Sequence, residues 1–232
     1  MNATRSEWEE REDAFGPATE VRELIEVFCQ TPDAILLESI VDRVCHQSRP
    51  MSDETIARHV RKYCGTPDMG WSDPASGIFV GRYPAVPDED LTTFLSAGLG
   101  SHVLTQPASG IQIRQEILLS VRNHYKYLQI QNVIFVVASL LLEKHLPIPR
   151  GQVIWPLPAL FPQIGGTCSG LFCGHPGFFP DDFVQIELEV PLIFVEVYPI
   201  TELEFRFIEM HGSDNFEEAV EDGEFDLLNL AR

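Results

Sequence analysis

The stretch IQIRQEILLSVRNHYKYLQIQNVIFVVASLLLEKH, residues 111–145, decides the fold, because it joins the clearest strand pattern in the chain to the longest apolar run. Isoleucine or leucine occupies most odd positions from Ile111 to Leu119, whereas Gln112, Arg114 and Glu116 occupy even positions. Successive side chains of a strand point to opposite faces, so this alternation is typical of a half-buried strand. We therefore predict a strand whose odd positions face the core.

Residues 125–145 carry too many apolar side chains for an exposed element and are too long for a strand, so we predict a central helix that covers the sheet. Pro147 and Pro149 are expected to end it. The apolar run 133–142 would rise only about 15 Å as a helix, half of a hydrocarbon core of roughly 30 Å. This segment is therefore predicted to be a buried helix and not a membrane span.

Working outward toward the N-terminus, residues 1–65 carry three amphipathic patterns with helical spacing, at 21–28, 33–44 and 52–63. Gly65 is expected to stop the third. We predict two parts, an N-terminal helical extension over residues 1–52 and one domain over residues 53–232. The expected fold class is α+β, with a mixed, mainly antiparallel sheet flanked by helices.

The other predicted strands are short apolar segments between Gly, Pro, Asp and Ser. They lie at 77–81, 91–95, 183–190 and 192–198. Residues 150–182 are rich in Gly, Pro and aromatic residues, and we predict a loop region there with at most short strands at 153–155 and 160–161.

The end of the chain is predicted to form two helices. Thr201 and Glu204 have the spacing of a capping box, in which the N-cap hydroxyl and the N3 carboxylate each bond to the other residue's backbone N–H. Gly212 should terminate this helix, and a last helix should run over residues 213–222.

The charge of the protein restricts its partners. Thirty-five acidic residues against sixteen basic ones give a net charge of −19, which repels phosphate backbones and anionic lipid. We therefore predict no nucleic-acid and no membrane partner.

The opening MNATRSEWEERED has no apolar run for a signal peptide, so we expect a cytoplasmic location. The odd number of cysteines, five, fits free thiols better than a disulfide framework.

Three segments resemble the suppressor-of-fused domain family, over roughly residues 54–230. The run VYPITELEFRFIEMHGSDNFEEAV, residues 197–220, is similar to the strand, ITxxE helix start and HGSD turn of that family. YPAVPDEDLTTFLSAGL, residues 83–99, followed by IRQEILL, residues 113–119, is similar to its strand pair with T-x-G-L and E-L-x-L segments. LPIPRGQVI, residues 146–154, lies where the family has a G-x-P-L-x-x-G-D turn.

The resemblance implies a mixed α/β domain that recognises proteins, as a bacterial immunity protein does for its cognate toxin or an animal pathway inhibitor does for a transcription factor. The short chain is more similar to the bacterial form. Ser96 replaces the threonine of the T-x-G-L segment, Gly151-Gln152 replaces the Gly-Asp turn, and DLLNL, residues 226–230, replaces a proline-containing ending. These departures affect the expected edge loops more than the expected core.

The sequence contains only weak patterns for a catalytic or metal site. Cys168, Cys173 and His175 could ligate zinc, but there is no second short-spaced pair, so we favour structural thiols and predict no metal and no cofactor. Asp181-Asp182 could be imagined as general acid and base, although a helix cap explains them as well. The chain lacks the G-x-S-x-G, H-E-x-x-H and P-loop lysine patterns, and we expect it not to be an enzyme.

The acidic residues are concentrated at the C-terminal end, where residues 181–232 contain fifteen acids and two bases and so supply thirteen of the nineteen net negative charges. Such a surface can steer a basic partner, although a solvated helix face that maintains solubility is the alternative. Aromatic anchors could add affinity. The predicted partner-binding residues are Glu217, Glu218, Glu221, Asp222, Glu224, Asp226, Trp155, Phe172 and Phe178.

The leading hypothesis is an immunity protein that neutralises a toxin with a basic surface. The alternative is a regulatory adaptor that sequesters a signalling or transcription factor by strand addition at a sheet edge. A third hypothesis is an enzyme that uses the loop at 165–182.

Overall fold

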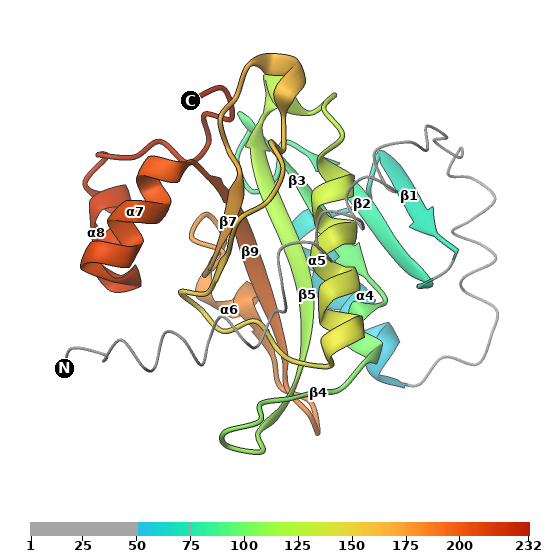
Figure 1. Ribbon diagram of the computed structural model, residues 1–232. Coiled ribbons are helices and arrows are strands. Elements are labelled where there is room, and N and C mark those ends of the chain that lie inside the picture. Colours follow the sequence, from blue (N-terminus) through green and yellow to red (C-terminus); the bar gives the residue numbers. More distant parts are fainter. Residues whose placement is uncertain (1–50, 75) are drawn as a thin grey trace.

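The structure, a computed structural model, describes residues 51–74 and 76–232 (Figure 1). The predicted helical extension over residues 1–52, with its first two helices, lies almost wholly outside the described residues. The described helices are α4 (Met51–Cys64), α5 (Ile130–Lys144), α6 (Asp181–Val184), α7 (Glu202–His211) and α8 (Ser213–Glu221). The strands are β1 (Met69–Asp73), β2 (Ile78–Pro84), β3 (Leu91–Ala97), β4 (Leu104–Thr105), β5 (Gln112–Arg122), β6 (Val153–Ile154), β7 (Gly170–Gly174), β8 (Gln185–Ile186) and β9 (Leu192–Ile200).

The strands form one mixed sheet in the order β1-β2-β3-β5-β9-β7-β6, with β4 paired to β5 and β8 paired to β9. Every pairing is antiparallel except that between the two central strands β5 and β9. This confirms the predicted α+β class with a mainly antiparallel sheet flanked by helices.

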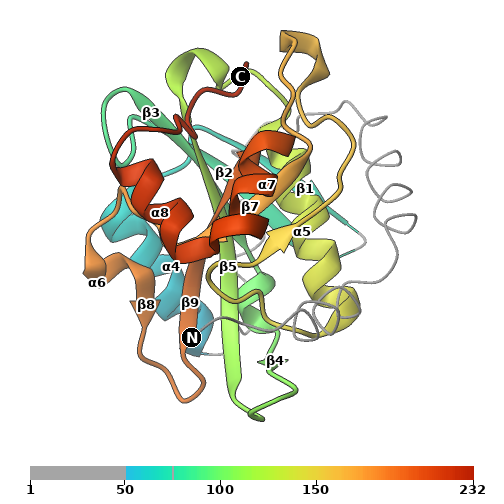
Figure 2. The same ribbon diagram turned by 60° about the vertical axis from the view of Figure 1, so that its left-hand side comes forward.

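Strand β5 confirms the strand predicted at 111–119, but the expectation of one buried face was wrong. Ile117 and Leu119 pack with α5 on one face, while Leu118 packs with α4 on the other. Glu116, expected in solvent, is also buried. Helices cover both faces of the centre of the sheet (Figures 1 and 2). The alternating pattern of the sequence therefore separates an apolar face from a more polar one, but it does not mean that the more polar face is in contact with solvent.

Helix α5 confirms the predicted central helix, although it is shorter than residues 125–145. It begins at Ile130 after a 3₁₀ turn over Asn123–Tyr125. It ends at Lys144, before the prolines, because His145 adopts a left-handed conformation (φ 53°) and donates its backbone N–H to Leu141 O at 2.9 Å. Among the described residues, no helix has the length and apolar content needed to cross a membrane.

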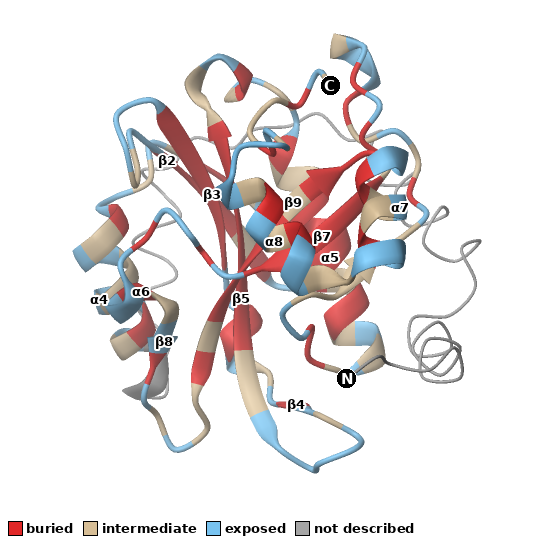
Figure 3. Cartoon of the chain, turned by 90° about the vertical axis from the view of Figure 1, so that its left-hand side faces the viewer, coloured by how far each residue is buried: buried red, intermediate tan, exposed pale blue. Residues whose placement is uncertain are grey.

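The face opposite α5 is covered in two halves. Helix α4 buries Ile56 in the cluster that contains Phe183 and Phe194, and its His59 stacks on both of those rings. Helices α7 and α8 cover the β7 half, as the view in Figure 3 shows. The strand predicted over 183–190 was wrong. After Pro180 at the N-cap, a short helix forms instead, and its acidic first turn is favoured at a helix N-terminus. This helix places Phe183 in the core and leaves only β8 as strand.

Strand β7 was missed in the sequence, and the strand expected at 160–161 is not formed. All five β7 residues are buried, so the segment shows no alternation. Its first glycine is required by a neighbouring ring, since a Cβ at Gly170 would lie 2.3 Å from the Trp155 ring, whereas a Cβ at Gly174 would make only a tight contact of 3.1 Å with Tyr198. The short strand expected at 153–155 is confirmed as β6.

The two C-terminal helices are confirmed. Thr201 and Glu204 form the predicted capping box of α7, and Gly212 ends that helix with a φ of 86°. Helix α8 follows immediately, and the pair buries Ile208 and Phe216 against Phe172 of β7. Together they lie against the face of the sheet near β7 and β9 (Figure 2).

Candidate functional site

The turn before β6 contacts the start of α8. A Cβ on Gly151, which has a φ of +80°, would lie 2.7 Å from Ser213 Oγ, so only glycine allows the two segments to approach this closely. The neighbouring Arg150 donates from Nε to Glu217 Oε1 at 2.9 Å and to Oε2 at 3.1 Å. The turn at 150–152 and the HGSD turn, which the family resemblance singled out separately, therefore meet in one place.

An acidic groove of about 520 Å³ lies at this contact. Its lining residues are Arg150, Gly151, Ser213, Asp214, Glu217, Glu218 and Glu221. The hydrogen bonds to Glu217 raise the pKa of Arg150, with smaller contributions from the charges of Asp214 and Glu221. One guanidinium therefore faces four carboxylates, and the groove retains a strong net negative charge that favours a cationic ligand.

Some of the predicted acidic residues form ion pairs with arginine, and others form none within the described residues. Glu217 pairs with Arg150, and Asp226 pairs with Arg122 at 2.8 Å. The remaining predicted acids are exposed, and in the part of the chain that the structure describes none of them forms an ion pair with lysine or arginine. These free carboxylates are Glu218, Glu221, Asp222 and Glu224.

The three predicted aromatic anchors have different environments. Phe172 is only 2% exposed and packs edge-to-face on Phe216, so its expected place in an exposed loop was wrong and it belongs to the core. Phe178 is 45% exposed but does not line the acidic groove. Trp155 is half-buried and stacks on Phe205, with ring centroids 4.5 Å apart and planes 8° from parallel.

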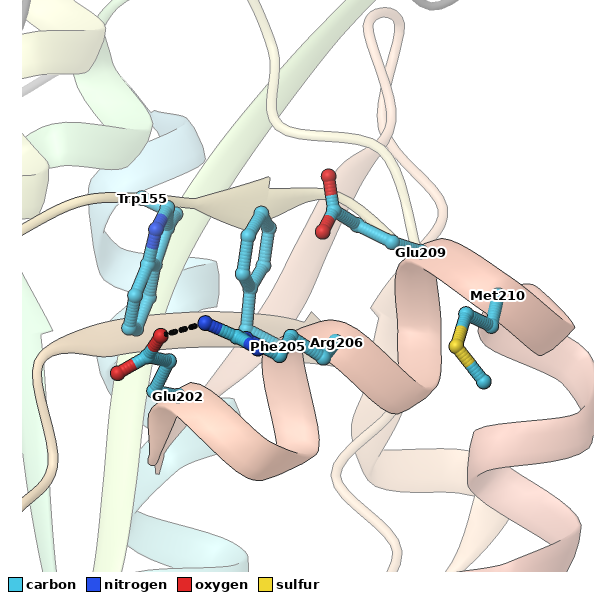
Figure 4. Close-up of a pocket in the computed structure, with 6 residues that line it drawn as sticks. All are labelled: Trp155, Glu202, Phe205, Arg206, Glu209 and Met210. Carbon is cyan, nitrogen blue, oxygen red and sulfur yellow. Dashed lines mark hydrogen bonds and ion pairs between the residues drawn. The ribbon is translucent and has the colours of Figure 1, made fainter.

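A second groove, of about 410 Å³, is built on this aromatic pair (Figure 4). Its lining residues are Trp155, Glu202, Phe205, Arg206, Glu209 and Met210. Glu202 and Arg206 form an ion pair along α7, and Met210 is 75% exposed. The contributions of Phe205, Arg206 and Met210 were missed in the sequence, because they depend on which face of α7 the sheet leaves uncovered.

The candidate zinc ligands do not form a site. Cys168 and Cys173 are buried, and burial raises the pKa of both thiols, while His175 is exposed. Within the described residues, no group of three or more His, Cys, Asp or Glu side chains is arranged to hold a metal ion. These cysteines therefore have the surroundings of structural thiols.

A buried carboxylate links the two runs of the remaining segment of the family resemblance, residues 83–99 and 113–119. Glu116 Oε2 accepts a hydrogen bond from Ser96 Oγ at 2.5 Å, and Oε1 accepts from the backbone N–H of Gly98 at 3.1 Å and of Gly100 at 2.8 Å. A serine hydroxyl thus does what a threonine hydroxyl could do at position 96. The pairing joins β3 to β5, so these motifs have a structural role and are not part of the exposed site.

Comparisons with known proteins agree with this geometry. A family model described as "Suppressor of fused protein (SUFU)" matches residues 72–232, which begin in β1 and include both grooves. A search of curated protein sequences gave no significant match.

Solved structures of this kind share the fold. A protein from Neisseria gonorrhoeae FA 1090 described as a suppressor of fused homologue superposes with a TM-score of 0.58 at 16% identity, over 78% of this chain and 94% of that one. The Sufu–Fu complex gives 0.56 at 10% identity, over 75% and 84%. Drosophila Suppressor of Fused gives 0.54 at 10% identity, over 75% of this chain and 46% of that one.

Proposed function

Because this chain belongs to the suppressor of fused protein family, we propose that it acts by binding another protein and not by catalysing a reaction. The observation that carries the proposal is the acidic groove between the turn at 150–151 and α8. Of its four carboxylates only Glu217 has a cationic partner among the described residues, and the others face solvent. A solved structure with this fold contains a complex of Sufu with Fu, which supports a protein partner.

The partner proposed is a protein toxin with a basic surface, and the chain is its immunity protein. Nuclease toxins need a basic active site to bind nucleic acid. An inhibitor with exposed carboxylates can cover such a site, because charge complementarity increases both the association rate and the specificity of the complex. The acidic excess over residues 181–232 supports this proposal, and the reaction that the toxin catalyses is left open.

Binding to the protein encoded immediately upstream tests this function. We expect 1:1 binding that becomes roughly tenfold weaker when Glu218 and Glu221 are both changed to lysine, a loss of about 1.4 kcal/mol. The matched control changes the exposed Glu143 and Glu189, which lie outside both grooves, to lysine.

An equal loss of affinity in both double variants would mean that the net charge of the protein, and not the acidic groove, determines binding. Absence of binding at every salt concentration would contradict the immunity function and favour the adaptor hypothesis.

A further inference from the structure

The groove on α7 has a fixed apolar wall. The Trp155 ring lies against Gly170 on β7, where a Cβ would come within 2.3 Å, and it stacks on Phe205. Both contacts hold the ring in one orientation. A wall that is ordered before binding reduces the entropy lost when a ligand side chain enters.

Met210 forms an apolar edge of the same groove, and this residue is 75% exposed to water. Figure 4 shows it on the α7 segment that follows Glu209, at the opposite end of the groove from Trp155. An exposed methionine in the same groove as a stacked aromatic pair is a composition that protein interfaces favour, because Met and Trp are enriched where water is excluded on binding.

The charged residues around this groove indicate which partner fits. The carboxylate of Glu202 is engaged by Arg206, whereas Glu209 has no ion pair in the described part of the chain. The acidic groove lies at the other end of the same edge segment, at Arg150. Arg150 and Trp155 are five positions apart in the chain, so their Cα atoms lie at most about 18 Å from each other.

We infer that the Trp155–Met210 groove receives an apolar side chain of the partner, and that lysine or arginine residues within about six positions of it contact the carboxylates of Asp214, Glu218 and Glu221. The occupant is therefore a short segment of a basic protein that carries one apolar anchor beside its cationic residues. This inference rests on the proposed function and deepens it by stating what the partner presents.

Selection of random dodecapeptides displayed on phage against the whole immobilised protein tests the inference, and it can be carried out before the partner is identified. The enriched peptides should combine an aliphatic or aromatic residue with at least two lysines or arginines. A synthetic copy of the leading peptide should bind about tenfold more weakly to Met210→Ser and to Glu218→Lys/Glu221→Lys than to the unaltered protein.

Leu203→Ser is the matched control, because Leu203 is 78% exposed on the same helix but does not line the groove. It should leave the affinity unchanged. Peptides without basic residues, equal losses for Met210→Ser and Leu203→Ser, or no enrichment would each overturn the inference. Self-association of the protein that Met210→Ser abolishes would also overturn it, since a second copy would then be the occupant.

Failure of the inference is distinguishable from failure of the proposed function. If the upstream protein loses affinity for Glu218→Lys/Glu221→Lys but binds Met210→Ser normally, the acidic site is correct and the apolar anchor is not. If the upstream protein does not bind at all, the immunity function fails, while the peptide selection still reports on the groove.

Discussion

Glu196 is a fully buried carboxyl group on the central strand β9. Its oxygens accept hydrogen bonds from Ser120 N at 3.2 Å and from the Tyr198 hydroxyl at 2.8 Å. Burial nevertheless raises its pKa from 4.5 to about 7, and the hydrogen bonds only partly oppose that shift. A carboxyl group with a raised pKa binds its proton more tightly in the folded state than in the unfolded state.

The free energy of unfolding should therefore be highest below about pH 4.5 with respect to this group, and should fall as the pH rises toward 7. The full loss is roughly 3 kcal/mol for a shift of this size. We expect Glu196→Gln to remove this slope in urea denaturation between pH 5 and pH 8, whereas Glu143→Gln, on the exposed surface, keeps it. Parallel curves for the wild type and Glu196→Gln would show that the carboxyl does not titrate in this range.

Three donors converge on the buried carboxylate of Glu116, from Ser96, Gly98 and Gly100. Glu116→Ala would leave these donors without an acceptor and should lower the free energy of unfolding by about 3 kcal/mol or more. Glu116→Gln keeps the shape and one acceptor oxygen, so it should lose less. Chemical denaturation measures the free energy of unfolding of both variants. An equal loss for the two would mean that the negative charge of Glu116, and not the placement of its acceptor oxygens, stabilises this contact.

At the level of elements, the contact between the turn at 150–151 and α8 depends on a glycine. Gly151 and Gly223 have the same φ of +80°, but a Cβ would meet Ser213 at 2.7 Å only at Gly151, whereas nothing lies within 4 Å of Gly223. Gly223→Ala should therefore cost only the left-handed conformation, about 1–2 kcal/mol. Gly151→Ala should lower the free energy of unfolding by the same amount and, in addition, by the cost of displacing α8.

Thermal unfolding of the two alanine variants measures the difference. We expect Gly151→Ala to be less stable than Gly223→Ala by at least about 1 kcal/mol, the order of an overpacked contact. We also expect only Gly151→Ala to weaken partner binding, because it moves the carboxylates of α8. Equal stability of the two variants would mean that the turn and the helix can separate without cost.

The elements that the sequence predicted well are those with local signals. The capping residues Thr201 and Glu204 and the terminating Gly212 all belong to one short stretch of the chain, and the structure has them as predicted. Strand β7 could not be predicted, because its residues are buried on both faces and it owes its place to pairing with β9, about 25 residues later. The acids of the site could be named from composition, whereas the Trp155–Phe205 wall depends on tertiary contacts.

At the level of the whole molecule, the charge is unevenly distributed. The α5 side of the sheet buries a large apolar cluster, while α7 and α8 on the opposite face line both grooves and carry carboxylates that form no ion pair with any described residue, those of Glu209, Asp214, Glu218 and Glu221. Attraction between this end and a basic protein acts over a Debye length, about 30 Å at 0.01 M salt and about 3 Å at 1 M. The central claim is therefore that the α7–α8 end of the protein guides a basic partner into contact.

The most direct test of this claim is the association rate constant for the upstream-encoded protein, measured by stopped flow as a function of ionic strength. The wild-type rate should fall steeply as salt rises, and Glu218→Lys/Glu221→Lys should flatten that dependence while Glu143→Lys/Glu189→Lys changes it little. A wild-type rate that does not depend on salt, or a dependence that both double variants flatten equally, would contradict the account.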